Sequence, residues 1–184
     1  MTPPISRRTL VCLLLALPLL GCGDSGSTTP PDEKQNPPIT GRLDVEAWIA
    51  KGFYKSWKCE SAMHDARSPS PHGKNRICSN DKLSANTGGE YAVSAASVKE
   101  LGDDTGAIVG YAVAVHVAAG KTGDTWYWYE RVPLSSPAPH DNNGVVADGK
   151  GDAGPAKTIC VGCHSAAGID MAHSGHDFVY TQLQ

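Results

Sequence analysis

The 184-residue chain lacks several features that would place it in a common protein class. It carries 16 basic against 19 acidic residues and shows no basic patch or stripe, so we expect no binding to nucleic acid. It shows no internal repeat. The apolar run at residues 10–20 is interrupted by Pro18 and is too short to span a bilayer stably. Only one C-x-x-C motif is present, so no pair of such motifs is available for a zinc site.

The short apolar run predicts export. Arg7 and Arg8 precede it as a basic segment, as in a secretory signal peptide. The residues that follow, Leu19-Leu20-Gly21-Cys22, are similar to a bacterial lipobox, in which the cysteine is lipidated and becomes the mature N-terminus. The alternative is an ordinary signal peptide in which Cys22 is coincidental.

These features divide the chain into three parts. We expect a lipoprotein signal peptide at residues 1–21 and a small, polar, proline-rich disordered tether at residues 22–39. Residues 40–184 should form a single globular domain. Acyl chains on Cys22 would anchor that domain to the bacterial cell envelope on the periplasmic side.

The motif Cys160-Val161-Gly162-Cys163-His164 has the spacing of a c-type haem attachment site. Two thiols three positions apart can form thioethers with the two vinyl groups of one porphyrin. The adjacent imidazole can then serve as the proximal iron ligand. Two alternatives stay open: a zinc site that recruits Cys59 or Cys78 as fourth ligand, and a redox-active disulfide.

Cys59 and Cys78 are the remaining cysteines of the expected mature chain outside the haem motif and the lipobox. In an oxidising compartment we expect them to form a disulfide that closes the polar segment between them. Two free thiols are the alternative.

The hydrophobic pattern predicts a mainly β, α+β fold. Apolar residues at helical spacing predict an N-terminal helix over residues 44–57, with Asp44 as N-cap. Residues 90–101, 106–118 and 125–132 are β-rich and separated by turns, so an antiparallel β-sheet is expected. Residues 59–83 and 141–158 are interpreted as loops, and a C-terminal haem-binding segment follows.

The strand predicted at residues 106–118 has two different faces. One face is bulky and the other mostly small; the small face comprises Ile108, Gly110, Ala112, Ala114 and His116. Small side chains allow close approach by a flat group such as a porphyrin, or by a packed helix.

No residue stands out as a sixth iron ligand. Met171 lies only seven residues after His164, too close to reach the opposite face of a haem. His116 is the best protein candidate for the distal side. The other histidines occur in polar segments and are expected to be solvated: His64, His72, His140, His173 and His176. We therefore expect an open or water-bound distal position.

The chain resembles the cytochrome P-460 and cytochrome c-prime-beta family between about residues 45 and 179. The resemblance rests on the C-terminal haem motif and on shorter matches in the family's order. These matches are the tryptophan-containing first helix, Pro71-His72-Gly73, Ser97-Val98-Lys99-Glu100, the strand at residues 110–117, Trp126-Tyr127-Trp128-Tyr129-Glu130 and Asp177-Phe178-Val179.

The resemblance implies an antiparallel β protein, usually a homodimer, with one covalently bound haem c of open distal site. Family members either oxidise hydroxylamine through a haem cross-linked to a lysine, or bind nitric oxide without turnover. Lys99 matches the cross-linking lysine and Glu130 the proton-relaying carboxylate. The alternatives from the residues themselves are a solvated Lys99 beside Glu100 and a structural Glu130 beside Arg131. Electron transfer with a redox partner cytochrome is implied in either case.

Overall fold

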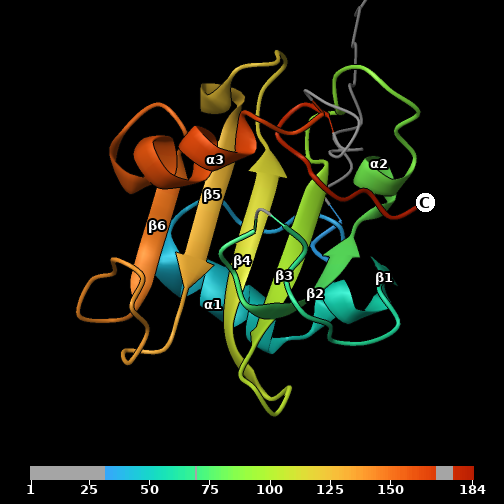
Figure 1. The fold of residues 1–184 in the computed structure, drawn as a ribbon. Coiled ribbons are helices and arrows are strands. Elements are labelled where there is room, and N and C mark those ends of the chain that lie inside the picture. The colour runs from blue at the N-terminus through green and yellow to red at the C-terminus, as the bar shows by residue number, and fades with distance from the viewer. Residues whose placement is uncertain (1–31, 69, 169–175) are drawn as a thin grey trace, which may run out of the picture. The chain divides into compact units, whose positions relative to one another are not determined.

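The computed structural model describes residues 32–68, 70–168 and 176–184. The predicted signal peptide and lipobox, with Cys22, lie outside the described residues, as do Met171 and His173. Six strands form one open sheet in which each strand pairs antiparallel with its sequence neighbour. The predicted mainly β fold with an antiparallel sheet is therefore confirmed (Figure 1).

Three strands lie where the sequence predicted them: β3 (Ala96–Gly102), β4 (Ile108–His116) and β5 (Trp126–Arg131). The other three arise in segments that were interpreted as loops: β1 (Lys58–Cys59), β2 (Lys74–Ser79) and β6 (Val145–Lys150). The loop interpretation of residues 141–158 is wrong for a further reason, because helix η3 (Ala156–Val161) begins there. Polar strands escape prediction because neighbouring strands, rather than their own pattern, stabilise them.

The predicted N-terminal helix is shorter than expected. Helix α1 covers Arg42–Ala50 with Gly41 as N-cap, so the assignment of Asp44 as N-cap is wrong. Gly52 adopts a φ of 69°, which ends the helix, and a short 3-10 helix η1 (Phe53–Ser56) follows. The remaining helices are α2 (Asp81–Ser84), η2 (Gly123–Thr125) and α3 (Gly162–His164). Within the described ranges, no helix has the length and apolarity required to cross a membrane.

The bulky face of β4 packs against α1 and η1. Val113 and Val115 belong there to a buried cluster with Trp48, Tyr54 and Trp57. The opposite face of the sheet carries the C-terminal helical segment, which lies over β5 and β6 (Figure 1). Because the bulky face takes the N-terminal helix, the small face of β4 is left open to the C-terminal segment.

Part of the predicted tether belongs to the domain. The backbone carbonyls of Glu33 and Lys34 accept hydrogen bonds from the indole N–H groups of Trp48 and Trp57, at 2.7 and 2.8 Å. The carbonyl of Gln35 accepts one from the Asn80 side chain at 2.8 Å. Residues 32–39 therefore lie against the domain that the sequence placed at residues 40–184.

A disulfide joins Cys59 to Cys78 across the paired strands β1 and β2. Replacing both residues, Cys59→Ser with Cys78→Ser, should lower the free energy of unfolding by about 3 kcal/mol, because the cross-link restricts the unfolded chain. Urea unfolding of wild type and variant would measure the difference. Reduction of wild type with dithiothreitol should reproduce the variant's midpoint; unchanged midpoints in both experiments would contradict the prediction.

Candidate functional site

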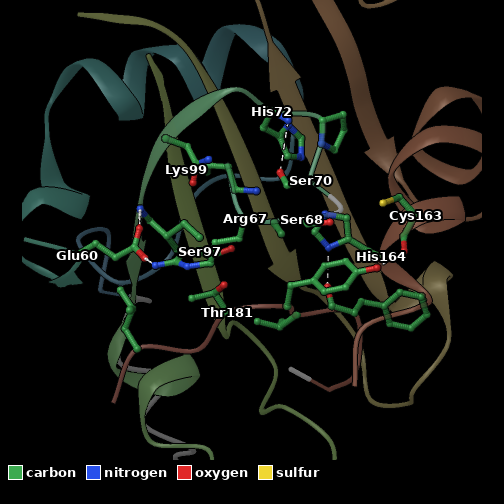
Figure 2. A pocket seen from close by; sticks show the side chains of 18 residues that line it. Glu60, Arg67, Ser68, Ser70, His72, Ser97, Lys99, Cys163, His164 and Thr181 are labelled. Carbon is green, nitrogen blue, oxygen red and sulfur yellow. Dashed lines mark hydrogen bonds and ion pairs between the residues drawn. The ribbon is translucent and has the colours of Figure 1, made fainter. Parts of the chain in front are cut away.

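A cavity of about 290 Å³ opens on the face of the sheet opposite α1. Four parts of the chain line it: the segment between β1 and β2, strands β2 to β4, helix α3, and residues 178–183 (Figure 2). Its volume lies at the lower end of the range for ligand pockets, roughly 300–1,000 Å³. The motif residues Cys163 and His164 and the candidate Lys99 all face it. The cavity is thus lined by residues that are far apart in the sequence.

Strand register explains why Lys99 and Glu130 are neighbours. Lys99 pairs with Ala112, and Ala112 pairs with Glu130, so the three lie in one row across β3, β4 and β5. Two strand spacings separate the backbones of Lys99 and Glu130 by about 10 Å. Ala112 is small, so two long side chains can approach each other above it. The side chains of Lys99 and Glu130 therefore lie on either side of Ala112, on the small face of β4.

Lys99 has no hydrogen-bond or ion-pair partner among the residues that the structure describes. It is half-buried, and its exposed part faces the cavity. Burial lowers the pKa of its amine to about 8, against the opposing effect of the Glu130 carboxylate. Glu100 points to the other face of the sheet, where it binds Tyr54 and Arg76 at 2.7 Å each. The Glu100 carboxylate is therefore not a neighbour of the Lys99 amine, which is half-buried at the cavity.

Glu130 is buried and interacts with a histidine that the sequence interpretation regarded as solvated. Its Oε1 lies 3.2 Å from Nδ1 of His72, which lines the cavity. Arg131 extends from the other face, towards Glu46. The partner of Glu130 is therefore His72 rather than Arg131, and the expectation that His72 is solvated is wrong.

His164 is held as a neutral imidazole with one free nitrogen. Its Nδ1 lies 2.7 Å from the backbone carbonyl of Phe178 and must donate to it, since a carbonyl only accepts. Burial lowers the pKa of His164 to about 4, so the ring is neutral and Nε2 keeps its lone pair. A backbone partner on the second nitrogen is typical of histidines that bind a metal.

The C-terminal segment orients the motif through two hydrogen bonds. Phe178, whose carbonyl accepts from His164, adopts a φ of 67°, which is uncommon for a residue other than glycine. Backbone strain of this kind concentrates at functional sites. The Tyr180 hydroxyl donates to the backbone carbonyl of Cys163 at 2.8 Å. Residues 176–184 of this segment contain no helix.

Close packing against two glycines places the motif helices beside the cavity. A Cβ atom at Gly123 or Gly151 would lie 2.5 Å from the Val161 side chain. Only glycine therefore lets η3 approach β6 and η2 this closely. On the other side, the Trp128 ring packs against the His164 ring with centroids 4.7 Å apart.

The two thiols of the motif have different surroundings. Cys163 lines the cavity, whereas Cys160 is buried in a cluster with Trp126 and Trp128. Burial raises the pKa of the Cys160 thiol to about 12, so it is not the low-pKa thiolate of a redox-active C-x-x-C. The zinc alternative loses its fourth ligand, because Cys59 and Cys78 are bonded to each other.

The other described histidines do not line the cavity. His116 is completely buried, and its Nε2 donates to the carbonyl of Gly120 at 3.0 Å, so it is a structural histidine and its assignment to the distal side is wrong. The other three are partly exposed, as expected, and each makes a hydrogen bond: His64, His140 and His176. The matched segment Pro71-His72-Gly73 was the one sequence signal that pointed to His72.

The donor set fits a c-type haem. His164 Nε2 has no hydrogen-bond partner among the described residues, and Cys160 and Cys163 are free thiols. Ala114 of the small β4 face packs against the cluster that contains Cys160 and lines the cavity with Cys163. Within residues 32–68, 70–168 and 176–184, no three His, Cys, Asp or Glu side chains form a metal-binding group by themselves. Comparison of the chain with protein-family models, curated proteins and solved structures found no match, so the side chains around the cavity are the basis for its function.

Proposed function

We propose that the chain is an exported, lipid-anchored c-type monohaem cytochrome of the cytochrome P-460 type. It oxidises hydroxylamine or a related small nitrogen species. The observation that carries this proposal is the position of Lys99: its amine faces the same cavity as Cys163 and His164 and has no hydrogen-bond or ion-pair partner among the described residues. A half-buried lysine amine without such a partner needs a reason. A bond to a haem edge would supply one.

Each residue of the site has a role in this proposal. Cys160 and Cys163 would hold the haem through thioethers, and His164 would bind its iron through Nε2. The bound haem would supply a redox-active iron with an exchangeable position. Lys99 provides the neutral amine for the cross-link, which its lowered pKa favours. The cross-link would replace one N–H bond of Lys99 and one C–H bond of the haem edge by an N–C bond, and the two electrons and two protons released would reduce one molecule of hydrogen peroxide to two of water.

The lining of the cavity favours the enzyme over a nitric-oxide-binding cytochrome. Hydroxylamine oxidation removes protons together with electrons, so it requires a base near the substrate. His72, partnered by Glu130, is a candidate for such a base within the lining. Gas binding requires only an open iron and an apolar pocket. Besides its apolar surface, this cavity presents charged and protic side chains: Glu60, Arg67, Ser68, Ser70, His72, Asn75, Ser97 and Lys99. Electrons would leave to a redox partner cytochrome.

Intact mass and a haem-peptide digest of the wild-type protein test this function. We expect one haem peptide that contains Cys160, Cys163 and Lys99, together with an absorption band displaced from that of ordinary c-type haem. A haem peptide with only Cys160 and Cys163, and Lys99 recovered free, would remove the cross-link. The nitric-oxide-binding alternative would then replace the enzyme.

Lipid anchoring is a separate prediction. Cys22→Ser should release the protein from membranes into the soluble periplasmic fraction, because the acyl chains on Cys22 contribute about 0.8 kcal/mol for each CH₂ group that they bury. Cell fractionation followed by immunoblotting measures the change. Cys12→Ser is the matched control and should leave the protein in the membrane fraction. An unmodified N-terminus on mature wild-type protein, found by mass spectrometry, would contradict the prediction.

A further inference from the structure

His72 has one ring nitrogen engaged and one free. Its Nδ1 lies 3.2 Å from Glu130 Oε1, and because an ionised carboxylate only accepts, Nδ1 carries the proton. In the neutral ring Nε2 then keeps a lone pair. Nε2 has no hydrogen-bond partner among the described residues. The side chain is 13% exposed, and the cavity is where it is accessible.

A second histidine in the same segment shows the contrast. His64 also pairs with a carboxylate, since its Nε2 lies 2.9 Å from Glu60 Oε2. Its Nδ1 is engaged as well, 2.6 Å from the backbone carbonyl of Asp65. Both ring nitrogens of His64 face acceptors, so neither is free to accept a proton from a ligand. His72 is the one of the two that can do so.

The surroundings of His72 suit a proton acceptor. Basic side chains line the cavity from β3, as Lys99, and from the segment of His72 itself, as Arg67. The Glu60 carboxylate of the same segment also lines it. The Glu130 carboxylate, from β5, stabilises the imidazolium that forms when a proton arrives. Helix α3 contributes the neutral His164 and the Cys163 thiol.

We propose that His72 accepts the proton of a small protic ligand that binds in this cavity, with Glu130 as its positioning residue. The transfer breaks one bond between hydrogen and a ligand atom and forms an N–H bond at Nε2 of His72. The electron pair of the broken bond stays on the ligand, so this step requires no oxidant. The inference deepens the proposed function, on which it rests for the haem that binds the ligand.

Cyanide binding to the ferric protein tests this role apart from turnover. Hydrogen cyanide is a weak acid that must lose its proton when it binds iron as the anion. Stopped-flow absorption of the haem band follows the association. We expect His72→Gln to slow association roughly 10²-fold, the lower end of the usual range for a positioned base. Glu130→Gln should slow it less and shift its pH profile, because His72 remains but loses its carboxylate partner.

Two further variants distinguish a proton-accepting role of His72 from a structural one. His64→Gln removes the other carboxylate-paired histidine of the same segment and should leave the association rate unchanged. In His72→Gly, added imidazole should restore the rate, which loss of a merely structural side chain would not show. Equal rates for wild type and His72→Gln, both carrying haem, would overturn the role of His72 alone. A wild-type protein without a haem band would overturn the proposed function and this inference together.

Discussion

A protein in which both motif thiols are replaced, Cys160→Ala with Cys163→Ala, is expected to carry no covalently bound haem. Each thioether requires one of these two sulfur atoms, and the disulfide leaves no other free thiol in the described part of the chain. Wild type should keep its haem through denaturation and acid–organic extraction. The double variant should release all of it, while each single variant keeps one thioether.

The disulfide variant Cys59→Ser with Cys78→Ser is the control for this experiment. It also lacks two sulfur atoms, but Cys78 lies in the core on the α1 side of the sheet, opposite the cavity. We expect it to be less stable and still to retain covalent haem. Complete extraction of haem from wild-type protein would exclude a c-type attachment and would reopen the other interpretations of the motif.

Loss of hydroxylamine oxidation is the expected result of Lys99→Ala, although the variant should keep its haem and still bind nitric oxide. In the proposed function, the thioethers and His164 would hold the haem without Lys99, whereas the cross-link would change the porphyrin's electronic properties and so its reactivity. The absorption spectrum should return to that of an ordinary c-type haem. Steady-state turnover with an artificial electron acceptor, together with the ferrous spectrum, measures both effects.

Lys74→Ala provides a matched control for the lysine experiment. Lys74 lies on β2 and pairs with the exposed Asp65, so its replacement removes a lysine from the sheet without reaching the cavity. Its turnover and spectrum should equal those of wild type. If Lys99→Ala keeps full turnover and shares one spectrum with wild type, Lys99 has no part in the chemistry.

Local sequence patterns predicted the strands that have a marked apolar or aromatic pattern of their own. The apolar alternation of β4 and the aromatic run of β5 predicted strands because each presents one side to a core. The same logic failed for β2 and β6, which depend on hydrogen bonds to β3 and β5. It also overextended α1, because a single glycine at positive φ ends that helix.

The sequence by itself contained the C-x-x-C-H motif and the candidate residues Lys99 and Glu130. It also predicted the mainly antiparallel sheet. These follow from local spacing and alternation, which a linear pattern records. Only the tertiary structure decided that Lys99 and Glu130 stand in one row across Ala112, and that His72 completes the site. Register and the course of a long polar segment depend on contacts between residues far apart in the chain. No local pattern contains them, because the free energy that selects them arises only when distant segments pack together.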